Sequence, residues 1–205
     1  GVGTTLVGDA VTDPVYYVAK YSSTGSFLWA HDWKPSGSNE LVITDMSVGP
    51  DGYLIVSGYV SAPSGMDLDP TSGGDVVTST AAGQPFLLRL NADGTYGWGE
   101  TFLVSSGAEG SIRSLSVSST GVITATAMFE NTLTLFGASL VSAGRSDVVI
   151  MRLNANATSL TWRTTITGDD LDWASDLKVL SDGRVFVSGG FTSTSVTVTG
   201  SDIST

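Results

Sequence analysis

Short runs of alternating apolar and polar residues, separated by turn sequences, extend along the whole chain. Residues 17–22 and 27–33 form two such runs around a Ser-Ser-Thr-Gly turn, and similar runs flank the turns that end at Gly52 and Gly94. Glycine supplies the positive φ that such hairpin turns require. Runs with the length and the 3.6-residue period of an amphipathic helix are absent. The pattern therefore predicts an all-β chain of hairpins with little helix.

One hairpin sequence occurs three times, each time ending in a tryptophan. The copies are YVAKYSSTGSFLW (17–29), FLLRLNADGTYGW (86–98) and VIMRLNANATSLTW (149–162). Trp98 follows Trp29 by 69 residues, and Trp162 follows Trp98 by 64. Such self-similarity at a fixed period is typical of repeat architectures.

A second motif recurs with the same period. It reads ITDMSV over residues 43–48 and GYLIVSG over 52–58, and its copies begin at Ile112 and Ala174. The middle copy departs from the pattern by having Ala127 in place of the last glycine. Two independent motifs with one shared period indicate three copies of a unit of roughly 65 residues.

Two hairpins in each copy predict a four-stranded antiparallel sheet, and radial repetition of such sheets is a β-propeller. We expect a β-propeller-like array of about three blades, either a partial ring or half of an oligomeric ring, because propellers typically carry 4–8 blades. The blade-like units cover roughly residues 41–104 and 112–167, with a composite blade formed by 174–205 and 1–33. In that composite blade the hairpin Ala174–Phe191 would share a sheet with the hairpin of residues 15–33. A β-sandwich is the main alternative, although it does not require self-similarity.

The repeated segments carry a family resemblance. Residues 86–98 resemble the "aFvaKlDssGnllW" segment of the bacterial SBBP-type β-propeller repeats, and residues 51–58 and 182–189 resemble its "sGNvyvtG" segment. Residues 66–70, MDLDP, are similar to the "vDFDPg" linker of these arrays. The resemblance implies a propeller from a secreted or surface protein of bacteria, and it implies no reaction. A fold of this kind hosts enzymes, lectins and scaffolds alike.

The composition of the chain limits the classes of partner that it is expected to bind. The 205 residues include 9 Lys and Arg against 20 Asp and Glu, which gives a formal net charge of −11. Such an acidic chain repels nucleic acids and anionic membranes, and no apolar run is long enough to insert into a membrane. The absence of Cys excludes disulfides, thiolate catalysis and cysteine metal sites. We expect an extracellular or cell-surface location.

Three aromatic residues do not recur between the copies: Trp33, Tyr59 and Trp173. Non-repeated aromatic side chains near loops are candidates for ligand binding, because the CH-rich face of a sugar packs against an aromatic ring. Plain packing in the core is the alternative for each of them.

A basic residue recurs at one position of the repeat, as Lys20, Arg89 and Arg152. These side chains could form a ring of anion-binding groups. Alternatively, their stems lie over the tryptophan of the same blade, or they pair with Asp45 or Asp176. Because a residue repeated in every blade usually serves packing, we favour a structural role.

Three carboxylates, Asp169, Asp170 and Asp172, lie close together in one predicted loop. Clustered Asp side chains can supply several of the 6–8 oxygen ligands that Ca²⁺ takes, so they are candidate calcium ligands. A solvated acidic loop is the alternative, and no other cofactor is expected. Asp67 and Asp69 form a second, smaller cluster.

No catalytic residues stand out. The expected function is therefore a non-catalytic extracellular module for adhesion, protein interaction or surface assembly, with a protein or glycan surface ligand and the option of homo-oligomerisation. A carbohydrate-binding, lectin-like propeller is the alternative. A glycoside hydrolase or lyase fragment is a third, less favoured reading, which needs two carboxylates in one cleft.

Overall fold

The computed structural model describes residues 3–8, 14–71 and 73–200. Within these ranges the regular structure is almost entirely β-strand, which confirms the predicted all-β class. The helical structure in the described ranges is one 3-10 turn, η1 (Pro50–Gly52). None of the described residues belongs to a helix long and apolar enough to span a membrane.

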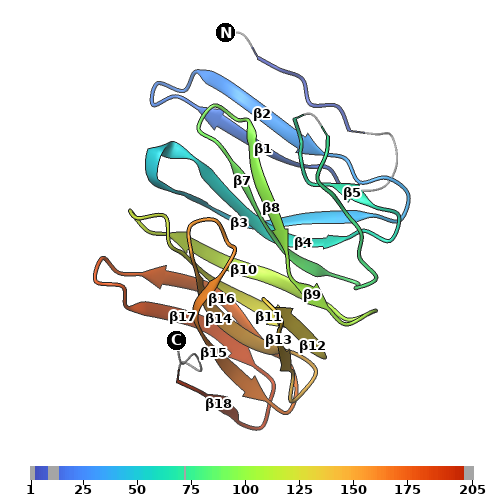
Figure 1. The fold of residues 1–205 in the computed structure, drawn as a ribbon, viewed down its shortest axis with the longest axis vertical. Helices are drawn as coiled ribbons and strands as arrows, with labels where there is room; N and C mark the ends of the chain where they lie inside the picture. Colours follow the sequence, from blue (N-terminus) through green and yellow to red (C-terminus); the bar gives the residue numbers. More distant parts are fainter. Residues whose placement is uncertain (1–2, 9–13, 72, 201–205) are drawn as a thin grey trace.

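Two antiparallel sheets form the middle of the molecule (Figure 1). Unit 1 has the strand order β3-β4-β7-β8, with β3 (Glu40–Val48), β4 (Leu54–Ser61), β7 (Gln84–Leu90) and β8 (Tyr96–Thr101). Unit 2 has the order β10-β11-β14-β15-β18, with β10 (Gly110–Val117), β11 (Ile123–Phe129), β14 (Asp147–Leu153), β15 (Leu160–Gly168) and β18 (Val196–Val198). In each unit, two consecutive hairpins join into one antiparallel sheet.

A two-stranded sheet flanks this pair at each end. The N-terminal hairpin consists of β1 (Tyr16–Tyr21) and β2 (Phe27–Trp33), and the C-terminal hairpin consists of β16 (Asp172–Val179) and β17 (Val185–Phe191). By sequence, the N-terminal hairpin corresponds to the second half of a unit and the C-terminal hairpin to the first half.

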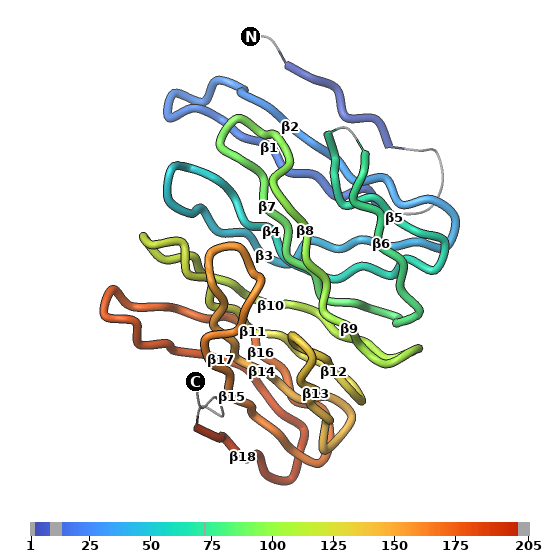
Figure 2. Tube along the Cα trace, viewed as in Figure 1, coloured from blue at the N-terminus to red at the C-terminus, as the bar shows by residue number. Residues whose placement is uncertain are grey.

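The two end hairpins do not share a sheet within this chain. Among the described strands, β1 pairs with β2 alone and β17 pairs with β16 alone. Figures 1 and 2 show the hairpins at opposite ends of the molecule, with units 1 and 2 between them. The composite sheet of residues 174–205 and 1–33 is therefore not formed by one copy, because the two edges are out of reach of each other. The described sheets form an open row and close no ring.

Short strands in the connections link neighbouring units. They are β5 (Met66–Asp67), β6 (Val76–Val77), β9 (Leu103–Val104), β12 (Thr132–Leu135) and β13 (Ala138–Val141). The connection of unit 2 reaches back through β12 to β9, which follows the last strand of unit 1. The next connection reaches back in the same way, since β18 pairs with β15.

Corresponding strands pair in the same register. The repeated basic residue directly faces the repeated tryptophan in all three copies, as Lys20–Trp29, Arg89–Trp98 and Arg152–Trp162. A β-bulge follows each of these basic residues. The three tryptophans are partly buried and pack against three separate core clusters.

Turn chemistry explains how the hairpins form. Gly94 closes the turn after β7 with a φ of 91°, and its N–H donates to the carbonyl of Asn91 at 2.9 Å. Glycine adopts this left-handed conformation without steric cost. In unit 2 the equivalent turn places Ala157 in the left-handed region, with a φ of 53°.

The hydrophobic core lies between consecutive sheets. Ile55 and Leu87 of unit 1 belong to one fully buried cluster with Ile123 and Val149 of unit 2. A second cluster joins the N-terminal hairpin to unit 1, and a third joins unit 2 to the C-terminal hairpin. Each sheet is therefore stabilised mainly by burying its faces against its neighbours in the row.

A polar contact also recurs at the joints. The Asp45 carboxylate of unit 1 accepts the backbone N–H of Leu115 in unit 2 at 2.7 Å. At the next joint, the hydroxyl of Ser114 accepts the N–H of Leu177 at 3.2 Å. Ser114 holds the position in unit 2 that Asp45 holds in unit 1. The chain thus uses one position of the repeat to fix the next sheet.

Candidate functional site

The first strand of each unit carries a bulge, and the three bulged residues meet in space. They are Thr44, Arg113 and Ser175, which interrupt the registers of β3, β10 and β16. These three strands pack beside one another, so residues far apart in sequence line one pocket of ≈390 Å³. Trp173 also lines this pocket. A bulge turns a residue out of the regular ladder, which explains how three side chains from three sheets reach a common place.

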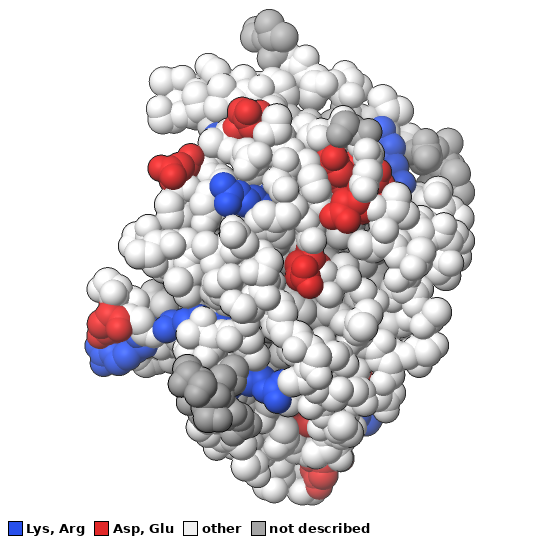
Figure 3. Space-filling view, in the orientation of Figure 1, with Lys and Arg blue, Asp and Glu red and all other residues white. Residues whose placement is uncertain are grey.

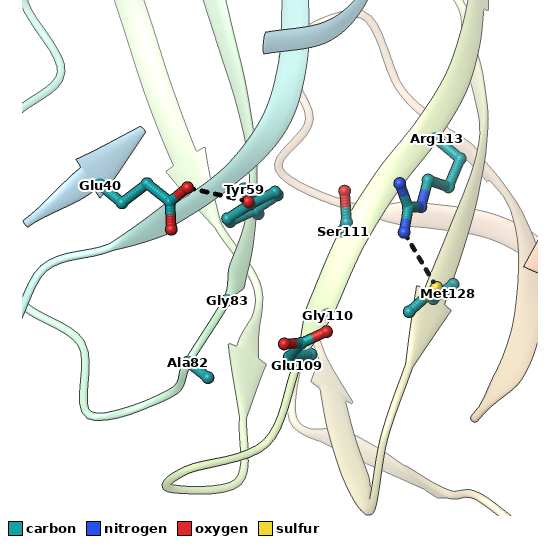
Figure 4. Close-up of a pocket in the computed structure, with 9 residues that line it drawn as sticks. All are labelled: Glu40, Tyr59, Ala82, Gly83, Glu109, Gly110, Ser111, Arg113 and Met128. Atoms are coloured by element: carbon teal, nitrogen blue, oxygen red, sulfur yellow. Dashed lines mark hydrogen bonds between the residues drawn. The ribbon is translucent and has the colours of Figure 1, made fainter. Parts of the chain in front are cut away.

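Arg113 also lines a second pocket, of ≈170 Å³, against unit 1 (Figure 4). Its other lining residues are Glu40, Tyr59, Ala82, Gly83, Glu109, Gly110, Ser111 and Met128. The Tyr59 hydroxyl donates a hydrogen bond to Glu40 Oε1 at 3.1 Å. Burial, followed by the negative charge of Glu40, raises the pKa of Tyr59 to about 12. The phenol is therefore protonated at neutral pH and remains a hydrogen-bond donor.

The Arg113 guanidinium is poorly satisfied inside the protein. Its Nη2 donates to the thioether sulfur of Met128 at 3.2 Å, which is a weak acceptor. Its Nε is buried and has no hydrogen-bond partner. Within the part of the chain that the structure describes, Arg113 takes part in no ion pair. Because a buried donor without an acceptor costs free energy, this pocket favours an acceptor group supplied from outside.

The structure brings two of the three candidate aromatic residues close to the same cation. Tyr59 and Trp173 line the two pockets that share Arg113. Trp33 has a different place, because it is buried and its indole N–H donates to the carbonyl of Leu68 at 3.0 Å. Its contacts fit the packing alternative. Sequence analysis missed Arg113, although its alignment with Thr44 at the bulge could have marked it.

The repeated basic residues lie over aromatic rings. The Lys20 ammonium is 6.0 Å from the ring centroid of Trp29, and the Arg152 guanidinium is 5.2 Å from that of Trp162. Arg89 stacks instead on Tyr53, at 3.9 Å. These contacts fit the structural interpretation of this position.

The three candidate calcium ligands bind protein groups and do not converge. Asp169 accepts hydrogen bonds from the backbone and hydroxyl of Thr194 at 2.7 and 2.6 Å. Asp170 accepts from the Thr192 hydroxyl, and Asp172 accepts from that of Ser193. Over the described ranges, no three such side chains are arranged to hold a metal ion. The predicted calcium cluster is thus replaced by a loop in which each carboxylate has its own hydroxyl donor.

The smaller acidic cluster shapes a turn. One oxygen of Asp67 accepts the backbone N–H of Asp69 at 2.9 Å and that of Asp75 at 3.1 Å. The other oxygen accepts the N–H of Gly74 at 2.9 Å. The carboxylate of Asp67 therefore stabilises its own connection.

The two ends of the row expose surfaces that are covered inside it. The side chain of Phe186 is 60% exposed on β17, whereas Ile55 is fully buried at the equivalent position of β4. On β1, Tyr17 is 64% exposed, whereas its equivalents Phe86 and Val149 are fully buried. Each end strand also has one edge that no described strand pairs with. The end hairpins therefore expose apolar positions that the repeat buries in units 1 and 2.

Charged side chains do not form a single patch on the face shown in Figure 3. Acidic and basic residues are scattered there among neutral ones. Contacts on this face would therefore depend on shape and on neutral groups more than on one dominant charge.

Comparison with known proteins does not assign the chain to a family. No protein-family model matches the chain, and no curated protein matches it. The similarity to SBBP-type repeats thus remains a prediction from the motifs.

Proposed function

We propose that this chain is a non-catalytic β-repeat module for protein interaction and surface assembly, which binds through the two ends of its row of sheets. The observation that carries the proposal is a difference in burial at one position of the repeat. Leu115 and Leu177 are 5% and 3% exposed because the preceding sheet covers them, whereas the equivalent Met46 is 57% exposed. An exposed apolar surface at a position that a preceding sheet covers in the other copies marks an interaction site.

We further propose that the units are blades of a propeller-like array at the bacterial cell surface or outside the cell. Two features support this: antiparallel sheets built from consecutive hairpins, and apolar clusters between the faces of successive sheets. The resemblance to SBBP-type repeats points to the same class of proteins. A scaffold role needs stacked, repeated contacts, and the recurring polar contact at the joints supplies one.

Light scattering tests the assembly role. We expect the solution mass to rise above that of one chain as the protein concentration increases. Met46→Asp places a charge on the uncovered face of β3 in unit 1, and Phe186→Asp places one on the C-terminal hairpin, so each should weaken association. Val141→Asp is the matched control, since Val141 is 71% exposed on β13, which pairs with β12 and belongs to neither end hairpin. A mass of one chain at every concentration and salt would refute the assembly role.

Carbohydrate binding is a second candidate, and the two pockets around Arg113 favour it. Tyr59 and Trp173 provide aromatic surfaces, while Arg113 and Glu40 provide a donor and an acceptor for hydroxyl groups. A glycan array, followed by titration of any hit with Arg113→Ala and Trp173→Ala, tests this role. Binding that both substitutions weaken would support it, and an array without hits would remove it. Release of reducing sugar from a bound glycan would instead favour the hydrolase reading.

A further inference from the structure

β1 and β17 each have one edge that no described strand pairs with. The two complete units show which strands pair at the equivalent edges. In unit 1, the second strand, β4, pairs antiparallel with the third strand, β7. In unit 2, β11 pairs with β14 in the same way. By sequence, β17 corresponds to β4 and β11, while β1 corresponds to β7 and β14. The pairing is absent for β17 and β1 because they lie at opposite ends of one chain.

The register of the missing pairing follows from the two that are present. Val56 faces Leu88 in unit 1, and Ala125 faces Met151 in unit 2. Transferring this register places Val187 of β17 opposite Ala19 of β1. The same transfer places Phe186 opposite Lys20 and Ser188 opposite Val18. In antiparallel strands a shift of one residue reverses the faces of all side chains, so the apolar pattern excludes odd-numbered shifts. Among the remaining registers, the transferred one is the register that both complete units use.

We propose that β17 of one copy pairs antiparallel with β1 of a second copy, with Val187 opposite Ala19. This inference rests on the proposed assembly function and names the partner as a second copy of the chain. The pairing completes a four-stranded sheet from the C-terminal hairpin of one copy and the N-terminal hairpin of the other. It covers Phe186 and Tyr17, whose equivalents are buried inside the row.

A second contact is consistent with this geometry. In the completed array, the C-terminal hairpin of one copy precedes unit 1 of the other. Asp176 holds the position of the repeat that Asp45 and Ser114 hold at the internal joints. Its carboxylate would then accept the backbone N–H of Met46 in the second copy, as Asp45 accepts that of Leu115. The burial of Met46 and the pairing of β1 thus have the same cause.

The charge of the chain sets the conditions for this association. Each copy carries a formal net charge of −11, so two copies repel each other at long range. Salt screens this repulsion, with a Debye length of about 10 Å at 0.1 M ionic strength. Association between apolar strands should therefore strengthen as sodium chloride is added, and weaken at low ionic strength.

Disulfide trapping tests the register, because the chain has no cysteine of its own. Directly opposed residues of antiparallel strands have Cα atoms about 4.5–5.5 Å apart, which suits a disulfide. Ala19→Cys and Val187→Cys are made as separate proteins, mixed and equilibrated in a glutathione redox buffer. The expected result is a cross-linked dimer in the mixture that exceeds the dimer formed by either protein alone. Ser188→Cys replaces Val187→Cys in the matched control, since its side chain projects from the opposite face.

The outcomes separate the two proposals. Cross-linking of Ala19→Cys with Val187→Cys, and not with Ser188→Cys, supports the register. Association by light scattering without this selective cross-link overturns the register and leaves the assembly function standing. Chains that stay single under all conditions overturn both. A circular dichroism spectrum matching that of the parent protein confirms that each variant is folded.

Discussion

The hydrogen bond between Asp45 and the backbone of Leu115, at the joint between units 1 and 2, should contribute measurably to the free energy of unfolding. Asp45→Ala removes the carboxylate that accepts the N–H of Leu115 at 2.7 Å and lies 3.1 Å from the Ser114 hydroxyl. Leu115 is buried, so its N–H is left without a partner. A hydrogen bond to a charged group contributes about 1.5–3 kcal/mol, and an unsatisfied buried donor costs about 1–3 kcal/mol. We expect a loss of about 2–3 kcal/mol in the free energy of unfolding.

Urea and thermal unfolding followed by circular dichroism measure this loss. For a chain of this size, 1 kcal/mol corresponds to about 2–4 °C in melting temperature, so Asp45→Ala should melt about 4–12 °C lower. Ser114→Ala removes the hydroxyl that accepts the N–H of Leu177 and lies within hydrogen-bond distance of the carboxylates of Asp45 and Asp176, and should cost about 1–3 kcal/mol.

Asp176→Ala is the comparison at the same position of the repeat. Its carboxylate pairs with Lys178 and lies 3.2 Å from the Ser114 hydroxyl, but within the described residues it accepts no backbone N–H from a following sheet. Measured in dilute protein, this substitution should change the melting temperature little. If Asp45→Ala and Asp176→Ala were equally destabilising, or if neither had an effect, the joint would not depend on this position.

Two further predictions each compare a pair of substitutions with different expected effects on stability. Burial, more than the nearby carboxylates, raises the pKa of Asp172, whereas hydrogen bonds from Thr194 lower that of Asp169. Ionised Asp172 therefore destabilises the folded state at neutral pH and Asp169 stabilises it, so Asp172→Asn should raise the melting temperature at pH 7 and Asp169→Asn should lower it. The Asp172 difference should shrink as the pH falls toward the ordinary Asp pKa near 3.8, whereas the Asp169 difference should persist to about that pH and shrink only below it. Melting curves from pH 7 to below pH 3.8 check both signs. Gly58→Ala would place a Cβ 1.8 Å from the backbone carbonyl oxygen of Val42 and should therefore lower the urea concentration at the unfolding midpoint. Ala127→Gly, at the equivalent position of unit 2, removes a buried methyl group at a cost of about 1 kcal/mol. We expect the midpoint to fall further in Gly58→Ala than in Ala127→Gly.

The repeat pattern was sufficient to predict the class of the fold and the local pairing of strands. The alternation of apolar residues and the turn glycines identified the hairpins around Trp29, Trp98 and Trp162, since these signals act within a dozen residues. The joining of the two end hairpins into one sheet was not found within a single copy. Local sequence signals do not report the distance between edges, and that distance depends on how many sheets lie between them.

The candidate site was less predictable than the fold. Non-recurrence selected Tyr59 and Trp173, which line pockets beside Arg113, and also Trp33, whose indole N–H donates to the carbonyl of Leu68. Binding by these residues stays a prediction. Arg113 was missed because its importance comes from a bulge, which moves a side chain out of the regular alternation. The Asp cluster at 169–172 failed as a metal site because nearby Thr and Ser hydroxyls satisfy the carboxylates one by one, and those hydroxyls come from a loop more than 20 residues away.

The reuse of one position at successive joints has a consequence for how such a chain can change over time. Because Asp45 and Ser114 perform the same task at neighbouring joints, a duplicated unit inserted between them would meet familiar surfaces on both sides. Lengthening the row by gene duplication would therefore require no newly invented contact. A residue with a short side chain that ends in a hydrogen-bond acceptor, at this position of the inserted unit, would bind a backbone N–H of the next sheet as Asp45 and Ser114 do.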